Sequence, residues 1–181
     1  QQLSNLRQRI IGMAKLTQQM VSRSIEVLSH PHDESLVKEI FEREEELDRL
    51  QVEIDRLSMQ LMVLFCPVAA DLRLVMSISR LTVELERIGD QAVNLCKSAQ
   101  LLPTSGQVCL IPEVLQLADV VKQMVADALD AFVQRDIQKA ESTILRDQEA
   151  DDLNQRVVEE LLSDGMAQEV MAGERAHLAD A

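Results

Sequence analysis

Apolar residues recur at steps of three and four over long stretches of the chain, as in helices that bury one face. The two clearest seams consist of Leu47, Leu50, Ile54, Leu57, Leu61 and Leu64, and of Leu74, Ile78, Leu81, Leu85, Ile88, Ala92 and Leu95. No stretch alternates with a period of two, as a half-buried strand would. The pattern therefore predicts an all-α protein whose helices pack at shallow angles in bundles.

Few residues interrupt the helical pattern, because the chain holds only five glycines and four prolines, mostly at its breaks. The helix-forming segments between the breaks predict helices at 3–29, 33–65, 67–101, 112–134, 136–164 and 174 to the end. Asp33 and Asp136 stand where helix N-caps belong, and Pro67 suits the first helical position.

An internal repeat relates the two halves of the chain. Aligning Asp33 with Asp136 also aligns Glu44 with Asp147, Glu46 with Glu149, Asp48 with Asp151 and Leu50 with Leu153. The repeated unit is a bundle of three helices, with the first repeat in residues 1–104 and the second in 105–181. The second copy of the third helix would start near residue 174, so we expect the second bundle to be truncated in its last helix.

The charge balance is strongly acidic, with 18 basic and 31 acidic residues and a formal net charge of −13. A phosphate backbone would be repelled, so direct binding to nucleic acid is disfavoured. Three phenylalanines are the only aromatic residues, which leaves few platforms for stacking bases or sugars. An acidic surface suits cations or basic protein partners instead.

The three cysteines, Cys66, Cys96 and Cys109, form no Cys-x-x-Cys pair and are odd in number. They predict buried thiols in a reducing compartment rather than a disulfide framework or a cysteine-rich zinc site. No run approaches the roughly 20 apolar residues that span a bilayer. We therefore expect a soluble, cytoplasmic protein.

Three pairs of acidic residues share a spacing of four: Glu44 with Asp48, Glu86 with Asp90, and Asp147 with Asp151. Residues four apart on a helix lie one above the other, roughly 6 Å apart. A helical wheel places the 86/90 pair opposite the apolar seam of its helix, and the 44/48 pair on a flank of its own seam. If the second and third helices are antiparallel neighbours, the two pairs can meet.

Two interpretations of these acids remain open from the spacing alone. Four carboxylates at one level would suit Fe, Mn or Mg ions, whereas zinc usually recruits His or Cys. Alternatively, the acids merely solvate a helix face, which is the more common situation in a protein this acidic. The equivalent positions of two of the pairs in the repeat favour a cation site without deciding for it.

Other chemistry is sparse. His30 and His32 flank a proline in a turn, where a solvated loop is the better interpretation, and His177 is isolated. No phosphate-binding glycine loop or nucleophilic triad is present, which disfavours a nucleotide site and nucleophilic catalysis. Gly89 interrupts a strong helical pattern, and its missing side chain leaves room for a close neighbour, a ligand or a partner.

Two stretches resemble the PhoU family of phosphate-signalling proteins. Residues 67–73 read Pro-Val-Ala-Ala-Asp-Leu-Arg, and residues 86–90 read Glu-Arg-Ile-Gly-Asp. The resemblance covers nearly the whole chain and implies a six-helix fold of two three-helix bundles, each with carboxylate motifs that bind metal. Cys66 stands where the family more usually has Gln.

By position, the resemblance places a first metal site on Glu44, Asp48, Glu86 and Asp90. Asp147 and Asp151 would form half of a second site, whose other half is expected beyond Ala181. The metal expected foremost is iron, with zinc, manganese or magnesium as alternatives.

The resemblance also implies a function. It predicts a non-catalytic regulator that restrains phosphate uptake and links the ATPase of a phosphate ABC transporter to a sensor histidine kinase. A homodimer is expected, with membrane contact only peripheral and through protein partners. The competing hypotheses are a carboxylate-ligated metalloenzyme or metal-storage bundle, and a purely structural bundle whose acids only solvate it.

Overall fold

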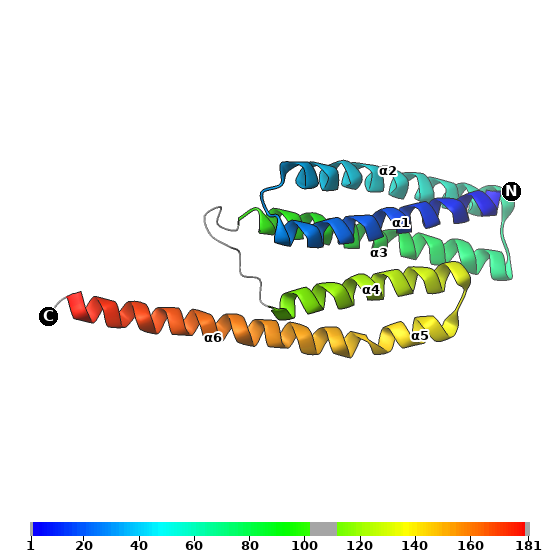
Figure 1. Ribbon diagram of the computed structural model, residues 1–181. Helices are drawn as coiled ribbons and strands as arrows, with labels where there is room; N and C mark the ends of the chain where they lie inside the picture. The colour runs from blue at the N-terminus through cyan, green and yellow to red at the C-terminus, as the bar shows by residue number, and fades with distance from the viewer. Residues whose placement is uncertain (1, 102–111, 180–181) are drawn as a thin grey trace. The chain divides into compact units, whose positions relative to one another are not determined.

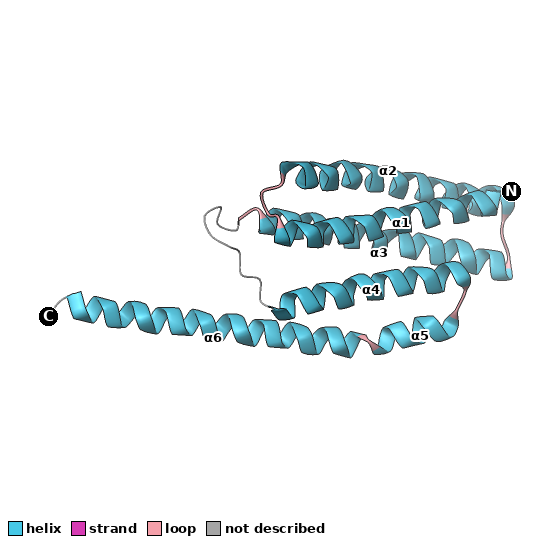
Figure 2. Cartoon of the chain, viewed as in Figure 1, coloured by secondary structure: helices cyan, strands magenta, loops and turns pink. Residues whose placement is uncertain are grey.

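The computed structural model of the protein describes residues 2–101 and 112–179, with side chains described up to residue 163. Every regular element in these ranges is a helix, which confirms the all-α prediction (Figures 1 and 2). The chain divides into two compact units, Gln1–Val108 and Cys109–Ala181. We describe each unit by itself.

Unit 1 is a bundle of three long helices: α1 (Gln2–Ser29), α2 (Glu34–Phe65) and α3 (Ala69–Ala99). Each helix packs against the other two, and short connections at opposite ends join them in sequence (Figure 1). The helices agree with the predicted ones except at the start of α3. There Val68 is the extended N-cap, so Pro67 precedes the helix rather than opening it.

The core of unit 1 is a continuous column of side chains at three- and four-residue steps along each helix. Its largest fully buried members are Leu6, Ile10, Met13, Thr17, Met20, Val27, Ile40, Leu47, Ile54, Val75, Ile78 and Leu85. The buried hydroxyl of Thr17 donates to the carbonyl of Met13 at 3.1 Å, so it needs no solvent. Long-range apolar burial of this kind, rather than helix propensity, holds the bundle together.

Both predicted N-caps are confirmed. The carboxylate of Asp33 accepts hydrogen bonds from the backbone N–H groups of Ser35 and Leu36, at 2.9 and 3.2 Å. Asp136 accepts one from Lys139 at 2.9 Å. These bonds satisfy N–H groups that have no partner inside the first helical turn.

Unit 2 contains α4 (Pro112–Gln134), α5 (Ile137–Leu145) and α6 (Asp147–Ala179), and α4 packs against both of the others. The predicted boundary between a helix at 136–164 and a helix from 174 to the end is therefore wrong. The break lies at Arg146, and a single helix continues from Asp147 across both glycines.

Two local causes explain this division. The first turn of α6 carries Asp147 and Glu149, and acidic side chains stabilise a helix N-terminus. Gly165 and Gly173 each cost a helix only about 1 kcal/mol relative to alanine, and no proline stands near them.

The core of unit 2 is smaller than that of unit 1. Within residues 112–163 the buried side chains are Ala131, Thr143, Leu153 and Val157. Most apolar residues of α4 are half-exposed, because within unit 2 α4 packs against α5 and α6 and these follow one another along the same side of it.

A shared acidic face of α2 and α3, and the family of the chain

Helices α2 and α3 come into close contact at a glycine. A Cβ atom added to Gly89 would overlap the Cδ2 atom of Leu47 and would lie 3.6 Å from the Cε atom of Met20. Of the three roles left open for this glycine, the structure shows the first, a close neighbour. The contact also fixes which turns of α2 and α3 stand at one level.

The predicted acidic residues lie next to this contact. Asp48 follows Leu47 on α2, and Asp90 follows Gly89 on α3; Glu44 and Glu86 each stand one turn before their partner. Since α2 and α3 are consecutive antiparallel helices joined by a short connection, the two pairs stand at one level of the bundle.

The electrostatics show that acids of the two helices face each other. The pKa of Glu86 is raised, first by its partial burial and then by the negative charges of Asp90 on its own helix and Asp48 on α2. Arg87 opposes this shift and does not cancel it. A neighbouring charge raises a carboxyl pKa only at short range, so Asp48, Glu86 and Asp90 share one face of unit 1.

The helical wheel misplaced Glu86. It is half-buried rather than opposite the core, whereas Asp90 is exposed as expected. The reason is that α3 buries Thr82, Gly89 and Cys96, which do not belong to the leucine seam. These small residues rotate the buried face of α3 toward Glu86, while Leu81, Ile88 and Leu95 of the seam are only half-buried.

The donor set fits a hard cation, since all four side chains are carboxylates that are exposed or half-buried. In the structure these four side chains do not converge on a common point. Within residues 2–101 and 112–163, no three His, Cys, Asp or Glu side chains stand close enough to hold one ion. Ligation by this face would therefore require its side chains to turn toward a shared ion, which their exposure permits.

The other candidate residues do not gather into a site. Asp147 and Asp151 are exposed on α6, and His30 and His32 are exposed at the α1–α2 connection. The side chain of His177 lies outside the described residues.

Of the three cysteines predicted to be buried, only Cys96 is shown to be so. Burial raises the pKa of its thiol. Cys66 is exposed, because it caps α2 in a left-handed conformation at the outer turn of the α2–α3 connection. Cys109 lies outside the described residues.

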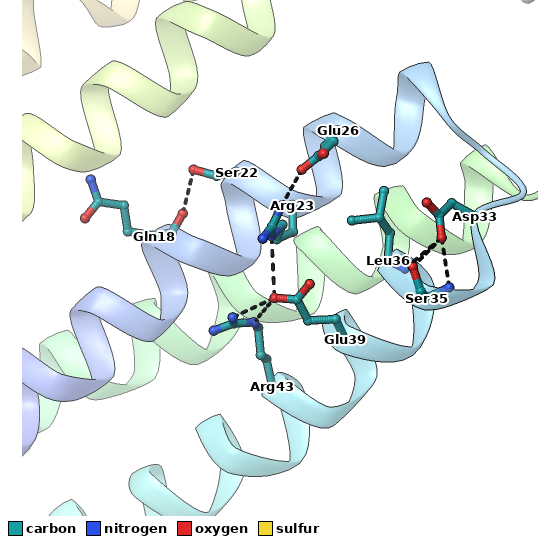
Figure 3. A network of polar contacts seen from close by, with 9 residues as sticks. All are labelled: Gln18, Ser22, Arg23, Glu26, Asp33, Ser35, Leu36, Glu39 and Arg43. Atoms are coloured by element: carbon teal, nitrogen blue, oxygen red, sulfur yellow. Dashed lines mark hydrogen bonds and ion pairs between the residues drawn. The ribbon is translucent and has the colours of Figure 1, made fainter.

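Sequence reasoning missed a network of ion pairs between α1 and α2 (Figure 3). Glu39 accepts from Arg43 at 2.6 Å on its own helix and pairs with Arg23 of α1 at 3.5 Å. The arginines lower the pKa of Glu39, Arg43 most strongly. The four-residue spacing of Glu39 and Arg43 could have predicted their ion pair within α2. Nothing in the sequence indicated that Arg23 of α1 would join it.

Unit 2 also has a network of ion pairs between its helices, with an acidic residue on its first helix. Asp127 of α4 pairs with Lys139 at 3.2 Å and with Arg146 at 3.4 Å. In the internal repeat, Arg146 aligns with Arg43. The repeat thus keeps the arginine, while the acidic partner lies on the second helix in unit 1, at Glu39, and on α4 in unit 2, at Asp127.

None of the helices within the described residues combines the length and the apolar character that crossing a bilayer requires.

A sequence model of the PhoU domain matches residues 10–99 and again residues 114–179. The chain belongs to the PhoU family. The two matches confirm the tandem arrangement of PhoU repeats, and each falls within one of the two compact units.

Curated PhoU relatives match most of the chain. The Aquifex aeolicus "phosphate-specific transport system accessory protein PhoU homolog" is 31% identical over 90% of this chain and 73% of its own length. The Escherichia coli protein PhoU, named a phosphate-specific transport system accessory protein, is 31% identical over 90% of this chain and 67% of its own.

Solved PhoU structures share the fold. PhoU from Pseudomonas aeruginosa superposes with a TM-score of 0.86 at 29% identity, over 91% of this chain and 79% of that one. The regulatory protein PhoU from Streptococcus pneumoniae gives 0.80 at 25% identity, over 89% and 75%. The PhoU family consists of accessory and regulatory proteins rather than enzymes, which confirms the prediction of a non-catalytic protein.

Proposed function

We propose that this protein is a metal-binding accessory regulator of phosphate transport. Its ion would be held by Glu44, Asp48, Glu86 and Asp90 on the shared face of α2 and α3. The observation that carries this proposal is the close contact of Leu47 with Gly89, which brings Asp48 of α2 and the Glu86/Asp90 pair of α3 to one level. A cation bound there would relieve the repulsion among these carboxylates, so binding and burial of Glu86 would favour each other.

Iron is the ion foremost in this proposal, and manganese and magnesium suit the same oxygen donors. Zinc is the least favoured on chemical grounds, because no His or Cys side chain belongs to the face. Asp147 and Asp151 would be one half of a second, equivalent site.

We further propose that the protein is an adaptor in the cytoplasm, active as a homodimer, between the ATPase of a phosphate ABC transporter and a sensor histidine kinase. The names of the relatives support the first partner, since they are accessory proteins of phosphate-specific transport systems. The kinase rests on the family resemblance. An acidic protein with a net charge of −13 suits partners with basic surfaces.

The experiment for the adaptor role is a direct binding assay. The purified chain is titrated against the ATPase subunit and, separately, against the cytoplasmic part of the sensor kinase from the same genome, with Fe²⁺ or with EDTA. Saturable binding to both, strengthened by the ion and lost in Asp48→Asn/Glu86→Gln, is the expected result. Absence of binding to either protein under both conditions overturns the adaptor role.

A matched variant keeps this assay specific. Glu45→Gln/Glu46→Gln removes the same charge from exposed positions of α2, beside the proposed ligands. If this variant loses partner binding as completely as Asp48→Asn/Glu86→Gln, general charge rather than a metal site governs the interaction.

A further inference from the structure

The rows of residues that carry acids on α2 and α3 continue along both helices as exposed apolar side chains. The row on α2 consists of Asp48, Val52, Asp55, Met59 and Val63. The row on α3 consists of Leu72, Met76, Ser79, Val83, Glu86 and Asp90. Within each row the steps are of three or four residues, so its members share one face of their helix. Each helix thus presents an apolar stretch that leads into its acids.

The two rows lie on the same side of unit 1. Phe41 stands two helical turns before Asp48 on α2, and Lys97 stands two helical turns after Asp90 on α3. The Nζ atom of Lys97 lies 5.6 Å from the centre of the Phe41 ring, so these extensions of the two rows are in contact. The rows therefore border one side of the α2–α3 pair together.

The apolar residues of the two rows stand in pairs. Leu47 contacts Gly89, and counting from this contact in opposite directions along the antiparallel helices shows which residues are level. To within one residue, the level pairs are Val52 with Val83, Met59 with Met76, and Val63 with Leu72. We call these six residues, which are 40% to 76% exposed, the apolar ladder. At 1.5 Å per residue its length is about 16 Å, enough for a helix of about three turns.

Charge divides this side of unit 1 into two parts. Residues 52–63 and 72–83, which contain the apolar ladder, hold two acidic and three basic side chains. Residues 44–49 and 84–90, which we call the acidic end, hold seven acidic and two basic side chains. Val52 lies four residues from Asp48, which is about 6 Å along the helix and within the screening length of about 8 Å. A ligand on the apolar ladder therefore also meets the negative potential of the acidic end.

This charge pattern disfavours a second copy of the chain on the apolar ladder. Two copies with parallel ladders bring one acidic end against the other. Two copies with antiparallel ladders bring each acidic end against residues 64–71 of the other copy, where Asp71 is the single charged side chain. Neither arrangement supplies basic groups to the acidic end. An anionic bilayer is disfavoured for the same reason.

We propose that the apolar ladder and the acidic end together bind one amphipathic helix of a partner protein. The apolar stripe of that helix lies along the ladder, and lysines or arginines in its terminal turn meet the acidic end. Met59 and Met76, in the middle of the ladder, have flexible side chains that adapt to the shape of a docked helix. A divalent ion on the proposed metal ligands would leave the acidic end negative, so this binding does not depend on the metal site.

A stapled model helix tests the charge complementarity. The labelled peptide is about four turns long, with leucines at steps of three and four and lysines in one terminal turn. A second peptide has glutamates in place of the lysines. Fluorescence anisotropy with the full chain in EDTA should show saturable binding of the lysine peptide, at least about tenfold tighter than that of the glutamate peptide. Equal affinities of the two peptides, or no binding of the lysine peptide, overturn the proposal.

Two variants of the chain locate the binding. Met59→Ser/Met76→Ser should weaken binding of the lysine peptide at least about tenfold, with unchanged helical circular dichroism. Ile137→Ser/Ile144→Ser, at exposed apolar positions of α5, is the matched control and should bind as the unaltered chain does. Equal affinities in all three proteins, or equal losses in the two variants, contradict docking on the apolar ladder.

A tryptophan in the ladder separates the possible occupants, because the chain has none of its own. The emission of Val52→Trp should shift to the blue when the lysine peptide is added. A blue shift that grows with protein concentration without peptide assigns the ladder to a second copy of the chain. A blue shift with phosphatidylglycerol vesicles alone assigns it to lipid. Either of these two results overturns the proposal.

Discussion

Leu47 of α2 fills the space that a side chain at position 89 of α3 would occupy. The absence of a side chain at Gly89 lets the two helices approach until Leu47 is almost completely buried. This contact sets the level at which the carboxylates of residues 48, 86 and 90 face each other. A glycine in the core thus positions the acidic face.

Gly89→Ala should destabilise unit 1. The added methyl group overlaps Leu47 in a packed core, and overpacking costs about 1–3 kcal/mol, which outweighs the gain of up to about 1 kcal/mol in helix propensity. Urea denaturation followed by circular dichroism measures the change.

Gly12→Ala is the control for this substitution. Nothing lies within 4 Å of a Cβ atom at Gly12, so the variant should gain about 0.5–1 kcal/mol from helix propensity alone. Equal effects of the two substitutions would show that the contact with Leu47 has no energetic consequence.

Glu86→Gln should stabilise the protein at neutral pH. The pKa of Glu86 is raised in the folded state, so folding favours the protonated form of this group. Its contribution to stability is therefore lost as the pH rises from the ordinary carboxyl value through the raised one. The advantage of the variant should appear across that window and vanish at lower pH.

Unfolding in urea as a function of pH measures this difference, in metal-free buffer. Glu84→Gln, which removes a carboxylate from an exposed position of the same helix and its pair with Arg87, is the matched control. A gain for Glu86→Gln that persists unchanged at low pH would contradict the electrostatic explanation.

Asp33→Ala should lower stability by leaving the N–H groups of Ser35 and Leu36 without their cap. The hydroxyl of Ser35, which donates to the same carboxylate, and these two N–H groups lower the pKa of Asp33. The contribution is therefore present above the ordinary carboxyl pKa and is lost as the pH falls through the lowered value.

Thermal unfolding at neutral and at acidic pH checks this prediction. Asp33→Asn should retain most of the stability at neutral pH, because asparagine also caps helices well. Equal losses in the alanine and asparagine variants would indicate that charge, not the cap, stabilises the helix start.

Glu39→Gln should cost less than about 1 kcal/mol, because the side chain is 31% exposed and surface ion pairs are weak. The loss should shrink in 1 M salt, which screens the pairs with Arg23 and Arg43. Glu42→Gln, in a more exposed pair with Lys38, should cost less still. A larger loss that is insensitive to salt would point to packing rather than to charge.

The helices and their caps could be predicted because local sequence determines them. The step of three and four between apolar residues and the caps Asp33 and Asp136 are local signals, and the structure confirms both. The division between α5 and α6 could not be predicted, because its local causes, an acidic first turn and two tolerated glycines, are weaker signals than the breaks that glycines usually mark.

The candidate site could be predicted only in part. The spacing of four singled out the acids, but the wheel set Glu86 opposite the core, since the burial of Thr82 and Gly89 follows from contacts with other helices.

Calorimetric titration of the full chain with Fe²⁺ under anaerobic conditions tests most directly whether the acids of α2 and α3 form one ion site. We expect saturable binding that falls at least about tenfold in Asp48→Asn/Glu86→Gln and is retained in Glu45→Gln/Glu46→Gln, because only the first variant removes proposed carboxylate ligands. Equal affinities in all three proteins, or no binding by the unaltered chain, would contradict it.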